Sequence, residues 1–213
     1  MLRHLKRRGL AAPKLAVADG ALGFWRALSD VFPETDEQRC WVHKIANVLD
    51  KLPKRLQPRA KSHLHEIMRA PDRQTALEEL SRFQAEYDDK YAKAVACLTK
   101  DQATLFTFMG YPAAHWIHIR TTNPIESGFS TVKARIRTTK GAGSRDAGLA
   151  MAFKLITMAE RRWRKINAPH LIPLFQIGTK FPDGKTRILP DLLSDSVVNL
   201  PMDATQELAI HNI

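Results

Sequence analysis

The sequence has only two cysteines, Cys40 and Cys97, and no apolar run that approaches the roughly 20 residues needed to span a bilayer. Two cysteines cannot build a disulfide framework, so we expect a reducing, cytosolic setting and no membrane partner. The basic start, Met1–Arg8, has no apolar core after it and so does not resemble a signal peptide. These absences argue against disulfide-rich secreted proteins and membrane-spanning proteins.

Acidic residues are also scarce, and no Asp or Glu precedes Asp19. Against 22 Asp and Glu there are 33 Lys and Arg, which gives a formal charge of +11 and a pI of about 9.9. Such an excess favours a polyanionic partner, because bound phosphates release their counterions. Nucleic-acid-binding, ribosomal and membrane-surface proteins share this signal. With 44% hydrophobic residues, the chain can bury a core as one domain with an insertion or as two small domains.

Residues 1–48 have the pattern of an α/β unit. A basic helix that ends at a glycine precedes an apolar strand, Leu15–Ala18, and Asp19 follows that strand directly. An amphipathic helix stopped by Pro33 leads to a second candidate strand, Gln38–His43. Strand, helix and strand at this separation predict a parallel crossover.

From Lys44 to Tyr111 the pattern is helical throughout. The expected breaks are Pro53, Ala70-Pro71 and Gly110–Pro112, and the best periodic segment is Thr75–Tyr91. No strand signal interrupts this stretch, so residues 49–115 are predicted to be an all-helical insertion or a separate helical domain. His63 and His65 lie two residues apart on one of these helices, and we expect both at the surface.

The segment Thr121–Ser127 opens the next helix, with Asn123 as the expected cap and Pro124 at the first helical position. Its predicted buried stripe is Ile125, Phe129, Val132 and Ile136. By the helical period, Glu126 lies on a neighbouring face together with Ser130, Lys133 and Arg137. One carboxylate and several cations therefore share one side of a helix.

Residues 116–181 are predicted to return to the first unit. They include a basic loop, Thr138–Ser144, and a long helix, Arg145–Ile166, while residues 182–213 form a polar tail that we expect to be poorly ordered. The candidate phosphate-binding cations of this region are Lys133, Arg135, Arg137, Lys140, Arg161, Arg162, Arg164 and Lys165. A solvated basic face explains the same pattern equally well.

Three segments in order resemble the Mutator-type transposases of bacterial insertion sequences. They are Leu15–Gly20 followed by Gly23 and Ala27-Leu28, then Gln38–His43 followed by Asn47-Val48, and finally Thr121–Ser127. Arg8–Leu10 and Phe32-Pro33 also match, so the resemblance covers about residues 1–181. It implies a ribonuclease-H-like core, here with two remaining parallel strands, a large helical insertion and an Asp-Asp-Glu triad that holds Mg²⁺.

By this resemblance Asp19 takes the second Asp position and Glu126 the Glu position, and both become catalytic metal ligands. Cys40 and His43 match a Cys-x-x-His motif of the family, and with Asn123 they become active-site support. Each has a structural alternative. Asp19 and Asn123 can be helix caps, and Asn123 with Glu126 has the spacing of a capping box. Cys40 can be a core cysteine and His43 a histidine at a strand end, since structural zinc needs a second ligand pair that the spacing does not supply.

The resemblance further implies Mg²⁺-dependent cleavage at terminal inverted repeats and joining of the 3′-hydroxyls to a target. The expected partners are double-stranded DNA, at the transposon ends and the target, and further transposase subunits, either in a homo-oligomer or in an assembly with full-length transposase. The expected location is the bacterial cytoplasm, at the nucleoid. The family's first Asp has no counterpart before Asp19, so we expect a truncated chain that is inactive alone. The alternative is a non-catalytic, basic DNA-binding or regulatory fragment that co-assembles with full-length transposase.

Overall fold

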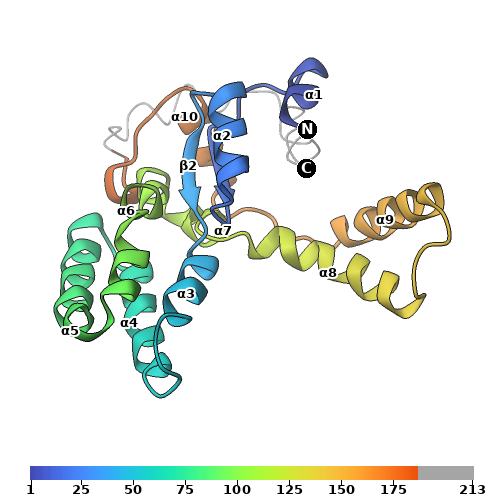
Figure 1. The fold of residues 1–213 in the computed structure, drawn as a ribbon. Helices are drawn as coiled ribbons and strands as arrows, with labels where there is room; N and C mark the ends of the chain where they lie inside the picture. Colours follow the sequence, from blue (N-terminus) through green and yellow to red (C-terminus); the bar gives the residue numbers. More distant parts are fainter. Residues whose placement is uncertain (187–213) are drawn as a thin grey trace.

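The computed structural model describes residues 1–186 of the 213. These residues are mostly helical, with one parallel two-stranded sheet formed by β1 (Leu15–Ala18) and β2 (Asp36–Arg39). Figure 1 shows α4 and α5 on one side of the sheet, and α8 and α9 extending away from the body on the other side. No helix within residues 1–186 is both long and apolar enough to cross a membrane.

The first unit has the predicted strand, helix and strand order. It begins with α1 (Leu2–Arg7), and α2 (Leu22–Val31) connects the two strands. The strands pair in parallel, from Leu15 opposite Asp36 to Ala18 opposite Arg39, so both the first strand and the crossover are confirmed. A small core of Leu28, Val31 and Phe32 packs α2 against the sheet and α1.

The predicted second strand, Gln38–His43, is wrong beyond Arg39. The strand ends at Arg39, and α3 (Trp41–Leu49) begins immediately after Cys40. The amide of Cys40 still donates to the carbonyl of Ala18 at 2.8 Å, whereas that of Trp41 donates to the carbonyl of Arg120 at 3.1 Å. The chain leaves the sheet here because Trp41, Ile45 and Val48 follow the helical period and enter a helical core.

The helical region confirms the predicted breaks. Its elements are α4 (Gln57–Arg69), α5 (Arg73–Thr99), α6 (Gln102–Leu105), η1 (Thr107–Gly110), η2 (Ala113–His115) and α7 (Trp116–Ile119). Residues 44–111 are all described and contain no strand. The long helix α5 has a kink at Tyr91, where the backbone leaves the helical conformation.

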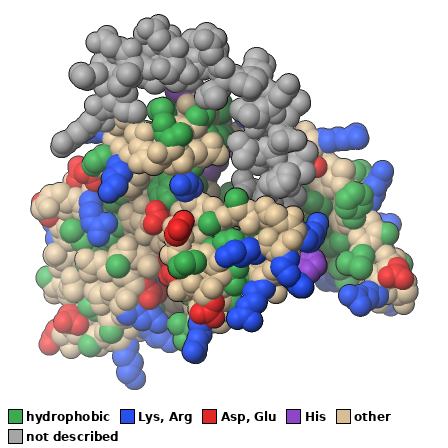
Figure 2. Space-filling view, turned by 90° about the horizontal axis from the view of Figure 1, so that it is seen from above, with side chains coloured by type: hydrophobic (Ala, Val, Ile, Leu, Met, Phe, Trp, Pro, Cys, Tyr) green, Lys and Arg blue, Asp and Glu red, His purple; other side chains and the backbone are tan. Residues whose placement is uncertain are grey.

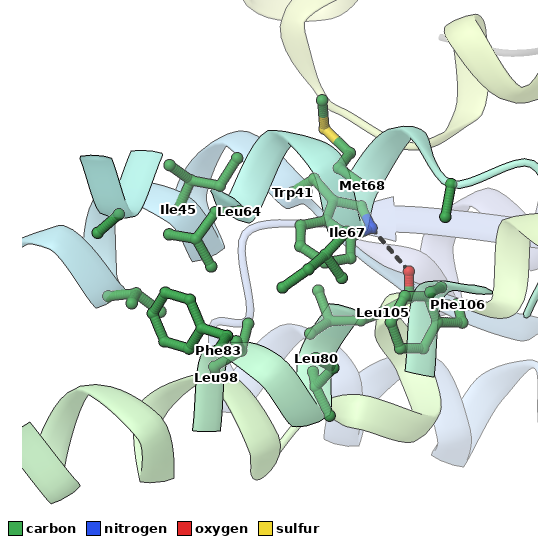
Figure 3. Packing of buried hydrophobic residues seen from close by; sticks show 14 of the residues in the cluster. Trp41, Ile45, Leu64, Ile67, Met68, Leu80, Phe83, Leu98, Leu105 and Phe106 are labelled. Carbon is green, nitrogen blue, oxygen red and sulfur yellow. Dashed lines mark hydrogen bonds between the residues drawn. The ribbon is translucent and has the colours of Figure 1, made fainter. Parts of the chain in front are cut away.

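The main core lies among these helices, and Figure 3 shows the side chains that converge there from α3, α4, α5 and α6. Trp41 is fully buried, and its indole nitrogen donates to the carbonyl of Leu105 at 2.8 Å. Its ring lies 5.7 Å from that of Phe106. This core anchors the start of α3, and therefore Cys40 and His43, to the helical region.

Helices α8 (Asn123–Thr138) and α9 (Arg145–Glu160) pack against each other as a projecting pair. The predicted buried stripe of α8 is wrong, because only Val132 is buried, whereas Ile125 is 60% exposed, Phe129 43% and Ile136 40%. The reason is that α8 extends beyond the body and its main helical neighbour is α9 (Figure 1). Figure 2 shows hydrophobic and cationic side chains side by side on the projecting part, at the right.

Two predicted helix boundaries also shift. Thr122, not Asn123, is the N-cap of α8, so Asn123 becomes its first residue and Pro124 its second. Helix α9 ends at Glu160 rather than Ile166, because the amides of Arg162 and Trp163 bond three residues back and tighten the chain into a turn.

The described chain ends with η3 (Pro169–Leu171), α10 (Ile172–Gln176) and η4 (Pro182–Gly184). The amide of Arg73 donates to Asp183 at 2.8 Å, so η4 contacts the start of α5. Of the predicted tail, residues 182–213, only 182–186 belong to the described residues, and residues 187–213 lie outside them.

Candidate active site

Asp19 lies at the carboxyl end of β1, where the sequence predicts it. Its side chain is exposed, and Oδ1 accepts a hydrogen bond from the amide of Ala21 at 3.1 Å. The N-cap of α2 is Ala21, so Asp19 is not the cap of that helix. Gly20 has φ of +91°, and a Cβ there would lie 2.4 Å from the guanidinium carbon of Arg39. The turn that presents Asp19 therefore requires glycine.

Cys40 and His43 lie at the start of α3 and are joined to the beginning of α8. The sulfur of Cys40 accepts a hydrogen bond from the amide of Thr122 at 3.3 Å and also lies 3.3 Å from its hydroxyl. His43 Nδ1 is 3.3 Å from the same sulfur. The motif predicted near the second strand thus connects two segments that are far apart in the sequence.

Glu126 lies one turn into α8 and faces the same cluster. The hydroxyl of Thr122 donates to Glu126 Oε1 at 2.5 Å, and His43 Nε2 is 3.7 Å from the same oxygen. The expected capping box with Asn123 does not form, since Thr122 is the cap and Asn123 is exposed. Through these contacts Glu126 is oriented by one neutral donor and one titratable group.

The electrostatics tie both carboxylates to His43. The hydrogen bond with Cys40 raises the pKa of His43, and the charges of Cys40, Glu126 and Asp19 add to this against the opposing effect of burial. Burial alone would raise the pKa of Cys40, but hydrogen bonds from Thr122 and His43 outweigh it and lower that pKa. The protonated form of His43 is therefore more favoured here than in a free imidazole.

The structure thus brings together Asp19, Cys40, His43 and Glu126, with Asn123 adjacent in the chain. Sequence reasoning missed Thr122, which contacts three of them; its place inside the Thr121–Ser127 motif was the available signal.

The cluster is not a closed metal centre. Within residues 1–186, three His, Cys, Asp or Glu side chains do bring ligand atoms within 4.8 Å of one another, but they lie elsewhere, on α4 and α5. Cys40 and His43 are also not part of any such zinc-like group within this range.

The predicted DNA-binding cations lie on the projecting helices and just after them. All eight are exposed: Lys133, Arg135 and Arg137 on α8, Lys140 in the following turn, and Arg161, Arg162, Arg164 and Lys165 beyond α9. Among the described residues none of them forms an ion pair within 4.0 Å. Unpaired, exposed cations are free to contact phosphate.

The α/β unit with Asp19, the helical region and the helix with Glu126 follow one another in the order that the three sequence motifs predict. The chain belongs to the Mutator family of transposases, whose sequence pattern matches residues 1–164. This assignment confirms the resemblance drawn from the three motifs.

Individual relatives agree with the family. The chain is 55% identical over 185 residues to the transposase for insertion sequence element IS6120 of Mycolicibacterium smegmatis, which covers 87% of this chain and 57% of the relative. It is 51% identical over 185 residues to the transposase for element IST2 of Acidithiobacillus ferrooxidans, covering 86% of this chain and 62% of the relative. The chain therefore spans about three fifths of the length of these relatives.

Proposed function

We propose that this chain is the catalytic-core portion of a DNA transposase that moves an insertion sequence. The observation that carries the proposal is that Asp19 and Glu126 lie at the two ends of the Cys40–His43 segment: Glu126 Oε1 is 3.7 Å from His43 Nε2, and Asp19 directly follows Ala18, whose carbonyl accepts from the amide of Cys40 at 2.8 Å. The family assignment and the names of the relatives support the same reaction class.

The fold proposed for this portion is ribonuclease-H-like. Three features support it: the parallel β1 and β2, the helical region that follows them, and the return of the chain to the end of β2, where the amide of Thr122 donates to the sulfur of Cys40. Within residues 1–186, β1 pairs with β2 alone and its other edge carries free backbone groups. A further strand bearing a third carboxylate would pair at that edge.

Mg²⁺ is the proposed metal, and the donor chemistry fits. Asp19 and Glu126 offer exposed carboxylate oxygens, which are the ligands that this hard ion prefers. When bound, the metal would activate the attacking oxygen and stabilise the leaving oxygen of a phosphodiester. No Asp or Glu precedes Asp19, so two of the three acidic ligands are accounted for. We therefore expect residues 1–213 alone to hold the ion weakly and not to cleave DNA.

The surrounding residues have proposed roles of their own. Thr122 and His43 hold the carboxylate of Glu126 in place through contacts with Oε1. Cys40 positions His43 through its sulfur. Asn123 is an exposed polar group next to Thr122 and would contact the DNA backbone. The exposed cations of α8 and of the segment after α9 would hold double-stranded DNA by its phosphates. Assembly with further transposase subunits completes the proposal.

The test is a transposition assay with a chimera in which residues 1–164 replace the matching segment of the Mycolicibacterium relative. We expect element excision that falls to background in the Asp19→Ala and Glu126→Ala variants. Asp146→Ala, which removes an exposed carboxylate of α9, is the matched control and should keep the activity of the chimera. Excision that survives Asp19→Ala would refute the assignment. Nicking by residues 1–213 alone would refute the need for a third ligand.

A further inference from the structure

A second group of ligand-bearing side chains lies in the helical region, on elements that contribute no side chain to the Asp19–Glu126 cluster. His63 and Glu66 belong to α4, and Glu79 belongs to α5. Each offers one ligand atom, and these atoms lie within 4.8 Å of one another. Since α4 and α5 are joined by three residues, 70–72, the two helices can hold a fixed spacing between the ligands.

The spacing matches the requirements of one small ion. His63 and Glu66 are three residues apart, so their side chains leave α4 on the same face. Across the gap, Glu79 Oε2 is 3.6 Å from His63 Nε2. Two ligands bound to one tetrahedral ion at about 2.0–2.2 Å lie roughly 3.3–3.6 Å from each other. The imidazole and the carboxylate thus already stand near the separation of two ligands of one ion.

The other ring nitrogen of His63 has the partner that metal-binding histidines use. Nδ1 is 3.7 Å from Glu86 Oε2, and Glu86 Oε1 is held 2.9 Å from the Nε of Arg59. At 3.7 Å this contact is longer than a hydrogen bond, but a carboxylate on that side of the ring favours a proton on Nδ1 and so leaves Nε2 for the metal. The ring also packs against Phe83, with 5.4 Å between centroids. His63 was predicted at the surface, but only 13% of its side chain is exposed.

An orphaned polar group adjoins this cluster. The side chain of Tyr87 is buried, and its hydroxyl has no partner in hydrogen-bonding geometry among the described residues. Burial raises the pKa of Tyr87, and the neighbouring Glu86 raises it further. The hydroxyl thus lies near Glu86 without a well-aligned hydrogen bond, and a buried hydroxyl in that state costs free energy.

We propose that His63, Glu66 and Glu79 form a binding site for one divalent cation of the zinc class. One imidazole nitrogen and two carboxylate oxygens are a donor set that Zn²⁺ accepts, with water in the remaining position. The ion ties α4 to α5 and so stabilises the helical region. This site is separate from the proposed Mg²⁺ ligands and does not depend on the proposed function.

Binding of the ion would replace one hydrogen bond of His63. Without metal, His63 Nε2 lies 3.1 Å from the backbone carbonyl oxygen of Glu79, to which it can donate. Coordination through Nε2 uses the tautomer that carries its proton on Nδ1, on the side of Glu86, so the metal takes the place of this hydrogen bond.

The experiment is a calorimetric titration of the full 213-residue chain with ZnCl₂, with thermal unfolding recorded with and without Zn²⁺. The decisive variant is Glu66→Gln, because Glu66 is exposed and its side chain makes no hydrogen bond or ion pair within residues 1–186. We expect one Zn²⁺ per chain, at least tenfold weaker binding in Glu66→Gln and in Glu79→Gln, and a Zn²⁺-dependent rise in Tm that these variants lose. Glu66→Gln without metal should unfold at the same temperature as the parent chain.

Two variants serve as matched controls and should bind as the parent chain does. Glu78→Gln removes an exposed carboxylate next to Glu79, and His65→Ala removes the other imidazole of α4. Absence of Zn²⁺ binding at micromolar concentration would overturn the proposal and leave His63 as an ion-pair partner of Glu79 and Glu86. Binding that Cys40→Ala abolishes and Glu66→Gln leaves unchanged would overturn it as well, because the ion would then lie at Cys40 and His43.

Discussion

Lys44 Nζ lies 2.5 Å from Asp101 Oδ2 and joins α3 to the residue that precedes α6. The lysine side chain is fully buried, and Arg39 Nε contacts the same oxygen at 3.3 Å. Burial alone would raise the pKa of Asp101, but the hydrogen bond and charge of Lys44 outweigh it and lower that pKa. This buried contact fixes the helix that carries Cys40 and His43 to the helical region.

Replacing Asp101 with Asn should therefore destabilise the fold. The substitution leaves the buried ammonium of Lys44 without an anionic partner, which typically costs about 3 kcal/mol or more. The free energy of unfolding, measured with urea, should fall by about 3 kcal/mol.

The control for this variant is Asp88→Asn, which removes an exposed carboxylate of α5 and should change stability by less than about 0.5 kcal/mol. Adding Lys44→Met to the Asp101→Asn chain should recover part of the loss, because it removes the stranded charge. An unchanged urea midpoint in Asp101→Asn would show that the ion pair does not support the fold.

The titration of His43 should report the geometry of the candidate active site. Its pKa is raised mainly by the hydrogen bond with Cys40, then by the charges of Cys40, Glu126 and Asp19. In an NMR titration we expect Cys40→Ala to lower this pKa most, Glu126→Gln less and Asp19→Asn least. Asp146→Asn, on α9, should leave the His43 titration unchanged.

The raised pKa of His43 also makes the free energy of unfolding depend on pH. Because the folded pKa of His43 lies above the unfolded value near 6.5, its contribution is fully present below that pH. It is lost as the pH rises through the raised pKa. Since 36% of the His43 side chain is exposed, the effect on the free energy of unfolding should stay below about 1 kcal/mol. A His43→Gln chain should lack this dependence.

The fold could be predicted from local patterns where these agreed with packing. The strand Leu15–Ala18 and the helix breaks at proline followed from backbone chemistry, which acts within a few residues. The second strand failed at Cys40 because Cys, Trp and Val favour strands locally, whereas the core around Trp41 requires a helix. The prediction of a buried stripe on α8 failed for a different reason. Periodicity identifies an apolar face of a helix but does not show whether another element covers it.

The candidate site also had a part that could be predicted from the sequence and a part that could not. Asp19 and Glu126 could be chosen because a strand end and a helix start present them, and the family resemblance paired them. The contact of Thr122 with Cys40 could not be predicted, since it joins the start of α3 to α8 across 82 positions of sequence. His63 was missed because its burial depends on α5, which a single-helix pattern does not reveal.

Binding of duplex DNA should depend on the exposed cations of α8. Replacing Lys133, Arg135 and Arg137 with Ala should weaken binding and flatten its dependence on salt, by about 0.9 in log-log slope for each lost phosphate contact. Fluorescence anisotropy with a labelled duplex at several KCl concentrations measures both quantities.

A matched triple variant separates this surface from net charge. Lys61, Lys90 and Lys93 are exposed cations of α4 and α5, and their replacement with Ala removes the same formal charge. It should leave the salt slope nearly unchanged. Equal losses in the two triple variants would mean that DNA contacts the protein through its overall charge and not through α8.

We expect the buried side chain of Gln38 to hold β2 against the helical region. Its side chain is fully buried, its Nε2 donates to the carbonyl of Leu105 at 3.0 Å, and its Oε1 accepts from the amide of Phe108 at 2.7 Å. Replacement with Met keeps the volume but leaves the buried amide of Phe108 without its partner, at about 1–3 kcal/mol. The carbonyl of Leu105 keeps its bond from Trp41. Urea unfolding should therefore show a loss of about 1–3 kcal/mol.

The comparison for this variant is Gln74→Met, at an exposed site where the amide bonds only Glu78 of the same helix. That substitution should change stability by less than about 0.5 kcal/mol. Gln38 joins β2 to α6 and η1, and β2 pairs with β1. Its replacement should therefore also loosen the end of β1 that presents Asp19. Hydrogen exchange should then quicken at the Cys40 amide, which donates to the carbonyl of Ala18 beside Asp19. Unchanged exchange at Cys40 in a destabilised Gln38→Met chain would mean that the sheet keeps its pairing without this contact.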